Sequence, residues 1–153
     1  MLEPRRLAAR AAAQRIAALM GEEVGGFAGY RTRIDSAVSA RTRIEVLTEG
    51  LFLRRLLGDP MLEDVACVIL DEVHERSLEA DLALAFCLDL QRTLRPDLRP
   101  VAMSATAETE RPATLMNAPV LTSQGRMFAL AVRHATKALP THRDISPAPA
   151  SGF

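Results

Sequence analysis

Two adjacent carboxylic acids, Asp71 and Glu72, directly follow a short apolar run, VACVIL, at positions 65–70. An Asp just beyond a buried strand can hold Mg²⁺, usually through water, and an adjacent Glu can orient or activate an attacking water. His74 and Arg76 follow closely enough to reach neighbouring groups. A lone Asp-Glu pair would favour a simpler interpretation, a strand end before a charged helix start. The complete run DEVHERS after VACVIL favours a metal–nucleotide site.

A zinc site is the alternative for the same stretch, because His74-Glu75 begins a string similar to HExxH. That motif places two His residues one helical turn apart on one face of a helix. Leu78 stands where the second His would be, so the second ligand is missing. The sequence therefore does not predict zinc.

Three further polar groups lie at the end of a predicted strand or at the start of a predicted helix. Ser104-Ala105-Thr106 follows residues 101–103, Thr48-Glu49-Gly50 follows residues 44–47, and Pro4-Arg5-Arg6 opens the first predicted helix. In open parallel sheets, ligands bind at the edge formed by the carboxyl ends of the strands. Helix N-termini at that edge also present unpaired N–H groups and a positive dipole to phosphates. We therefore expect one anion-binding edge built from all four groups.

The elements that must position these groups alternate between strands and helices. Apolar and β-branched runs predict strands, and capping residues with Gly and Pro stops predict helices. Strands are expected within 24–33 and over 43–47, 65–70, 100–104 and 119–122, and helices over 4–20, 48–57, 78–94 and from Thr106 onward, with a break at Pro112. Pro4 suits a first helical position, Gly21 a helix end, and Thr48 and Ser77 helix caps. Strand 65–70 is expected to be buried on both faces. This alternation predicts an α/β fold with a parallel sheet.

Bulk properties agree with one domain-sized globular chain of 153 residues, 48% of them hydrophobic. The net charge is zero, so no overall basic field points to nucleic acid. The charge is uneven, however: residues 1–60 carry ten Arg and seven acids, and residues 61–110 carry four Arg and eleven acids. No apolar run is long enough to span a bilayer. The two cysteines, Cys67 and Cys87, lie in apolar runs and are expected to be buried free thiols, which indicates a reducing, cytoplasmic location.

The motifs together resemble the DEAH/DExH-box ATP-dependent helicases of superfamily 2. Asp71–Arg76 (DEVHER) resembles their motif II, Met103–Thr106 their motif III, Thr48–Gly50 their motif Ib, and Pro4–Ala9 their motif Ia, in the same order and spacing. The longer strings LEPRRLAARAAAQRIA and DEVHERSLEADLALAFCLDLQ look most similar to the bacterial HrpB-type helicases. The resemblance covers residues 1–133 and implies a RecA-like domain of the P-loop NTPase type.

The resemblance also implies a role for each matching residue. Asp71 would coordinate Mg²⁺, Glu72 would position the hydrolytic water, and His74 would sense the γ-phosphate of ATP and couple it to Ser104 and Thr106. The backbone of single-stranded RNA or DNA would be contacted by Arg5, Arg6, Thr48 and Gly50, with Arg31 and Arg33 extending the same groove or lying on a solvated strand edge. Such backbone contacts are independent of sequence and sensitive to salt.

The chain also departs from the family pattern. No G-x-x-x-x-G-K-[ST] string occurs in it, so we expect an incomplete first RecA-like domain, lacking the Walker-A strand and loop, over residues 1–133. Residues 134–153 are rich in Pro, Ser and Thr and are expected to be a poorly ordered tail. A second RecA-like domain is expected in the full-length protein. The alternative is a catalytically inactive residual module with weak nucleic-acid binding, because the γ-phosphate would lack its main cradle.

Overall fold

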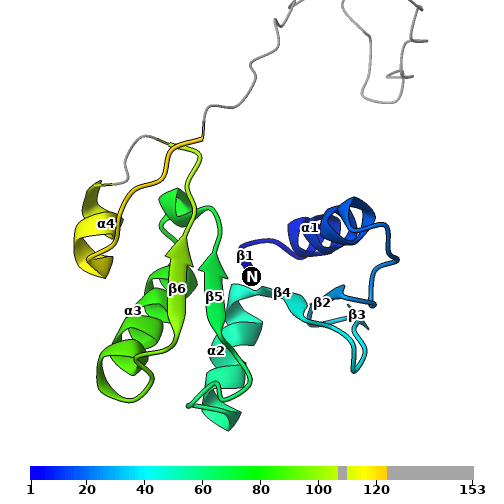
Figure 1. Cartoon of the computed structure of the whole chain (residues 1–153), viewed down its shortest axis with the longest axis horizontal. Coiled ribbons are helices and arrows are strands. Elements are labelled where there is room, and N and C mark those ends of the chain that lie inside the picture. The colour runs from blue at the N-terminus through cyan, green and yellow to red at the C-terminus, as the bar shows by residue number, and fades with distance from the viewer. Residues whose placement is uncertain (107–109, 124–153) are drawn as a thin grey trace, which may run out of the picture. The chain divides into compact units, whose positions relative to one another are not determined.

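The computed structural model describes residues 1–106 and 110–123. Within them a six-stranded sheet has the strand order β3-β2-β4-β1-β5-β6 (Figure 1). The strands are β1 (Leu2–Glu3), β2 (Ala28–Arg31), β3 (Ser36–Ala37), β4 (Ile44–Thr48), β5 (Cys67–Leu70) and β6 (Arg99–Ala102). The pair β2–β3 is antiparallel, and the other neighbouring pairs are parallel. The predicted α/β fold with a mostly parallel sheet is confirmed.

The described residues also form four α-helices and one 3₁₀ turn. They are α1 (Arg6–Leu19), α2 (Glu49–Gly58), the 3₁₀ turn η1 (Val73–Glu75), α3 (Leu78–Thr93) and α4 (Glu110–Met116). Residues Met1–Val120 form one compact unit that contains all of these elements. None of the described helices combines the length and apolar character that crossing a bilayer requires. The predicted tail over residues 134–153 lies outside the described residues.

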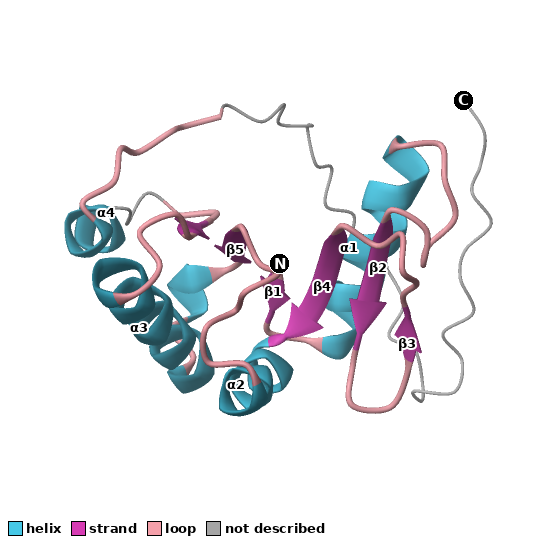
Figure 2. Ribbon diagram, turned by 60° about the horizontal axis from the view of Figure 1, so that its bottom comes forward, coloured by secondary structure: helices cyan, strands magenta, loops and turns pink. Residues whose placement is uncertain are grey.

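The helices cover the sheet from two sides, as Figure 2 shows. Because side chains alternate along a strand, Val46 and Leu47 of β4 point to opposite faces. Val46 packs with Ala9 and Ala13 of α1 and with Tyr30 of β2. Leu47 belongs to the larger cluster on the other face, which α2 and α3 complete; its buried members include Phe52, Leu62, Leu70, Ala83, Leu84, Cys87, Leu88 and Leu98. This two-sided packing fixes the register of β4 and so the position of the residues that follow it.

Most predicted helix limits agree with the structure. Ser77 caps α3 as expected, because its Oγ accepts a hydrogen bond from the Ala80 amide at 2.9 Å. Gly21 follows α1 with φ of +70°, the left-handed conformation that Gly adopts readily at a helix end. Thr48 occupies the N-cap of α2, but its side chain makes no capping hydrogen bond. Pro4 is not the first helical residue, because the chain before α1 is used for a strand.

Several sequence predictions of strands are wrong. Strands β1 and β3 were not expected, and each is only two residues long. Residues 119–122 form no strand. The two apolar side chains in this segment, Val120 and Leu121, are exposed, Leu121 by 92%, and do not pack into the core. Strand β5 is not buried on both faces. Cys87 is buried as expected, but Cys67 at the start of β5 is exposed, since α1 packs on β2 and β4 rather than over this position.

Candidate functional site

The strand order sorts the predicted site residues along one edge of the sheet. Strands β2, β4, β1, β5 and β6 run parallel, so their carboxyl ends lie at the same edge. The residues expected to contact nucleic acid follow β2, β4 and β1, and those expected to contact nucleotide follow β5 and β6. The boundary between the two sets lies between β1 and its neighbour β5, although β1 is one of the shortest strands. The two proposed ligands would therefore meet at the residues around β1.

Asp71 is placed beside β1 by the backbone. Its amide donates a hydrogen bond to the Leu2 carbonyl at 3.1 Å, immediately before the strand residue Glu3. The side chain of Glu3 is 5% exposed. Burial, and then the charge and hydrogen bonding of Asp71, raise the pKa of Glu3 to about 7. Two carboxyl groups, those of Glu3 and Asp71, therefore lie close together at this corner of the site.

Glu72 and His74 lie in the tight turn that follows β5. Glu72 has φ of 53°, the left-handed region that a non-Gly residue rarely adopts, and its amide donates to Asp71 Oδ1 at 2.8 Å. His74 Nδ1 lies 3.2 Å from Glu72 Oε2. The two atoms are not aligned as a hydrogen bond, so the buried Nδ1 has no hydrogen-bond partner among the described residues. Both side chains are half-buried, and the turn keeps them close to Asp71.

The Ser104–Thr106 segment joins this turn through the backbone. The Val73 amide donates to the Met103 carbonyl at 3.1 Å, which connects the ends of β5 and β6. Ser104 Oγ and Thr106 Oγ1 lie 3.1 Å apart, and the Thr106 amide donates to Ser104 Oγ at 3.2 Å. No direct hydrogen bond from His74 to either hydroxyl occurs in the described part of the chain. The coupling of His74 to these residues therefore stays a prediction.

The arginines after β1 begin the other half of the edge. Arg5 is the N-cap residue of α1 and Arg6 its first residue, and both are exposed. Arg5 Nη2 donates to Glu75 Oε1 at 2.8 Å, across a separation of 70 residues. Glu75 is the last residue of η1, so the contact joins the start of α1 to the turn that follows Asp71 and Glu72.

Thr48 and Gly50 lie at the start of α2, next to β1 in the sheet order. Glu49 between them is 7% exposed, and its Oε2 accepts a hydrogen bond from Ser77 Oγ at 2.6 Å. This contact ties the N-terminus of α2 to that of α3. Gly50 is exposed, and a Cβ added to it would meet nothing within 4 Å. The packing of α2 therefore does not require glycine here.

Arg31 and Arg33 occupy the far end of the edge, after β2. Arg31 forms an ion pair through Nε with Glu45 of β4, and Arg55 of α2 binds the second oxygen of the same carboxylate at 3.2 Å. Arg33 is exposed in the turn between β2 and β3. Arg31 is thus partly neutralised within the fold. Arg33 is the more accessible of the two to a polyanion.

The acidic corner fits a cation that arrives with a phosphate. No cluster of three or more His, Cys, Asp or Glu residues with the geometry of a metal site occurs in residues 1–106 and 110–123. Mg²⁺ in phosphate-transfer sites is commonly held by one or two carboxylates, with water and phosphate oxygens as its other ligands. A cation at this position would stabilise the ionised form of both neighbouring carboxyl groups, those of Asp71 and Glu3. Asp71 is the residue that would hold it.

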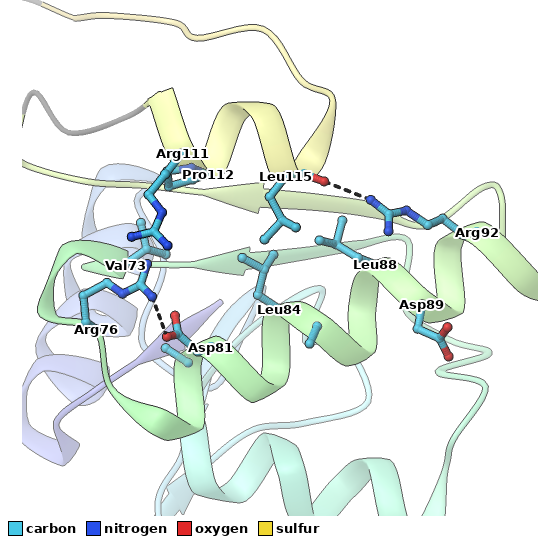
Figure 3. A pocket seen from close by; sticks show the side chains of 12 residues that line it. Val73, Arg76, Asp81, Leu84, Leu88, Asp89, Arg92, Arg111, Pro112 and Leu115 are labelled. Atoms are coloured by element: carbon cyan, nitrogen blue, oxygen red, sulfur yellow. Dashed lines mark hydrogen bonds and ion pairs between the residues drawn. The ribbon is translucent and has the colours of Figure 1, made fainter.

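A separate pocket of about 480 Å³ lies between α3 and α4 (Figure 3). Leu84 and Leu88 of α3 face Leu115 of α4 across it. Arg76 pairs with Asp81 at 3.0 Å on its rim, and Arg92 donates to the Leu115 carbonyl at 2.9 Å. Asp71 and Glu72 do not line this pocket. The candidate site is therefore the open sheet edge, with Val73 as the residue that it shares with the pocket.

Three residues that join the two halves of the site were not among the predicted site residues. They are Glu3, Glu49 and Glu75, and each contacts a group that the sequence had singled out or predicted as a cap. Glu49 and Glu75 lie inside two of the motifs and Glu3 lies directly before a third, but their partners are remote in sequence. Only the strand order reveals which remote residue each one meets.

The chain is similar in sequence to known helicases. The chain is 50% identical over 144 residues to the ATP-dependent RNA helicase HrpB of Escherichia coli, a match that covers 94% of this chain and 18% of the relative. It is 40% identical over 127 residues to the probable ATP-dependent RNA helicase DHR2 of Saccharomyces cerevisiae, which covers 82% of this chain and 17% of that protein. No protein-family model matches the chain.

The fold agrees with solved structures of a relative. The crystal structure of the Escherichia coli DExH-box NTPase HrpB matches with a TM-score of 0.77 and 53% sequence identity, over 84% of this chain and 16% of that one. A second structure, of the Escherichia coli DEAH/RHA helicase HrpB, matches with a TM-score of 0.77 and 54% identity over 83% of this chain and 16% of that one. The chain thus spans less than a fifth of the relatives it matches. By sequence and by fold, it belongs to the DExH-box helicase family that includes HrpB and HrpA.

Proposed function

We propose that this chain forms part of an ATP-dependent RNA helicase, contributing the motif II–motif III side of the Mg·ATP site and part of the path of single-stranded RNA. The observation that carries the proposal is the strand order, in which β1, followed by Arg5 and Arg6, lies next to β5, followed by Asp71 and Glu72. Relatives at 40–50% identity are named as ATP-dependent RNA helicases, which supports RNA as the nucleic acid.

Each residue then has a defined task. Asp71 would hold Mg²⁺, and Glu72, which follows it directly and donates its amide to Asp71 Oδ1, would orient the water that hydrolyses ATP. The Nδ1 atom of His74 is buried beside Glu72 Oε2, so His74 would contact a phosphate oxygen through the exposed part of its ring. Ser104 and Thr106 hold the adjacent strand end. Mg·ATP itself supplies the transferable phosphoryl group and the cation that neutralises its charge.

The RNA path follows the other half of the edge. Arg5 and Arg6 at the start of α1 lie next to the N-terminus of α2, where Thr48 and Gly50 present backbone N–H groups. Arginine side chains and helix N-termini both bind phosphate without reading bases. Arg33 extends the path past β2. Binding is therefore independent of sequence and weakens with salt.

No G-x-x-x-x-G-K-[ST] string occurs in the 153 residues, and this favours a more limited function for the isolated chain. Without the backbone N–H groups and Lys of such a loop, Asp71 binds Mg·ATP weakly. We therefore propose that the isolated chain binds single-stranded RNA and turns over ATP slowly or not at all. The helicase activity belongs to the complete assembly of motifs.

One pair of measurements tests both statements. Fluorescence anisotropy with a labelled oligouridylate measures RNA binding by the 153-residue chain, and phosphate release with and without RNA measures hydrolysis. We expect salt-sensitive RNA binding and hydrolysis close to background. RNA-stimulated hydrolysis that Glu72→Gln abolishes would refute the slow-turnover proposal. The RNA proposal fails if the folded chain shows no binding even at low salt.

A further inference from the structure

Two contacts connect the turn after Asp71 to the elements proposed to bind RNA. Arg5 Nη2 meets Glu75 Oε1 at 2.8 Å, and Ser77 Oγ donates to Glu49 Oε2 at 2.6 Å. The first contact joins the start of α1 to the end of η1, and the second joins the start of α2 to the start of α3. The segment from Glu72 to Ser77 is therefore attached to both proposed RNA-binding helix termini.

The two contacts differ in how easily a ligand could break them. Glu49 is 7% exposed, and Ser77 also caps α3, so this hydrogen bond is protected inside the fold. The Arg5 side chain is 72% exposed and that of Glu75 is 36% exposed. Exposed ion pairs contribute little stability, whereas Arg–phosphate contacts are strong and can be bidentate. A backbone phosphate that reaches Arg5 can therefore displace Glu75.

The turn that contains Glu75 has an unusual backbone conformation. Glu72 and Arg76 flank η1 with φ of 53° and 54°, left-handed values at non-Gly residues. Such conformations persist only where surrounding contacts hold them. Inside the turn, the Glu75 amide donates to the Glu72 carbonyl at 2.8 Å. A displacement of Glu75 therefore acts directly on the backbone of Glu72.

We propose that Glu75 is a positioning residue through which single-stranded RNA acts on the motif II turn: a bound phosphate takes the Arg5 guanidinium from Glu75 and releases one restraint on Glu72. This inference rests on the proposed function. In the free chain Glu75 occupies Arg5 and competes with RNA. In the bound chain the Glu49–Ser77 hydrogen bond keeps α2 and α3 joined while η1 rearranges.

Binding of a labelled oligouridylate at low salt tests the competition in the 153-residue chain. Glu75→Gln should tighten binding two- to fivefold, the range that an exposed ion pair can contribute. In an Arg5→Gln background the same change should have no such effect, since the residue that it frees is gone. Glu79→Gln is the matched control, because Glu79 is an exposed acid one turn further on. It removes the same charge without freeing Arg5.

Amide hydrogen exchange supplies a second readout that concerns the turn itself. RNA should speed exchange of the Glu75 and Arg76 amides, and Glu75→Gln should do so without RNA. If Glu75→Gln tightens binding equally with and without Arg5, or leaves exchange in the turn unchanged, the inference is wrong while RNA binding by the chain stands. If no variant binds RNA, the proposed RNA path fails, and the inference fails with it.

Discussion

The amide of Asp71 donates a hydrogen bond to the carbonyl of Leu2 at 3.1 Å, and this places the Asp71 carboxylate beside the buried carboxyl of Glu3. The contact joins the residue after β5 to β1, so it crosses the boundary between the two halves of the site. Two carboxyl groups at this position oppose one another's ionisation. Glu3 thus connects the stability of the sheet to the charge of the candidate site.

Glu3 should give the chain a stability that falls as pH rises. Burial and Asp71 raise the pKa of Glu3 from 4.5 to about 7, so between these values the folded state binds more protons than the unfolded state. The free energy of unfolding therefore decreases from pH 4.5 to 7, as ionised Glu3 becomes unfavourable in the fold. Urea unfolding in EDTA at pH 5 and pH 8 measures the difference. Glu3→Gln should remove this part of the pH dependence, and an unchanged slope in that variant would contradict the assignment.

The Glu49–Ser77 hydrogen bond should be worth more than an ordinary helix cap. Ser77→Ala removes the cap of α3 and leaves the buried Glu49 carboxylate without its partner, so we expect a loss of about 2–3 kcal/mol. Thr48→Ala is the matched control, because Thr48 occupies an N-cap without a side-chain hydrogen bond. It should cost less than about 0.5 kcal/mol. Urea unfolding midpoints compare the two, and equal losses would exclude a special role for Ser77.

Much of the fold could be predicted because periodicity and caps are local signals. The limits of α3 follow from Ser77 and the apolar pattern after it, and β4 follows from alternation over residues 44–48. Strand β1 could not be predicted, because Leu2 and Glu3 are too few to show a pattern and acquire strand character only by pairing with β4 and β5. The strand expected at 119–122 does not form, because an apolar pattern alone does not provide a neighbouring strand to pair with.

The sequence predicted that the candidate site residues share one edge of the sheet, but it could not predict the side-chain contacts among them. The four motifs were recognisable from residue types, and a parallel sheet places their residues at one edge. The contacts of Arg5 with Glu75 and of Arg31 with Glu45 depend on side-chain positions that no local pattern contains. Both arginines were expected to be available for a polyanion. In the fold, each of the two arginines is paired with a carboxylate, and a polyanion would have to displace that carboxylate.

The salt dependence of RNA binding should separate arginines on the path from arginines elsewhere. Arg5→Gln should reduce the slope of log affinity against log salt by about 0.7, because one phosphate contact with a single strand is lost. Arg33→Gln should act similarly if the path extends past β2. Arg15, exposed in the second half of α1, is the control and should leave the slope unchanged. Anisotropy titrations from 25 to about 200 mM salt cover the range in which such contacts are resolved.

Gly50 should show opposite effects on stability and on RNA binding. A Cβ at this position meets nothing within 4 Å, so Gly50→Ala should stabilise α2 by up to about 1 kcal/mol through its better helix propensity. The added methyl group would stand at the helix N-terminus where a phosphate approaches the backbone, so RNA affinity should fall. Gly58→Ala, at the other end of α2 and equally open, provides the comparison. RNA affinity that is unchanged in Gly50→Ala would remove Gly50 from the path.

The two cysteines should differ strongly in reactivity. Cys67 is exposed at the start of β5, whereas Cys87 is buried in α3 against the main core. Burial raises the pKa of the Cys87 thiol to about 12, so at pH 8 almost none of it is the reactive thiolate. A thiol-specific reagent should therefore modify Cys67 rapidly in the native chain and Cys87 only after unfolding. Cys67→Ser should abolish the fast phase; a fast phase that persists in this variant would show that the core around α3 opens in the native state.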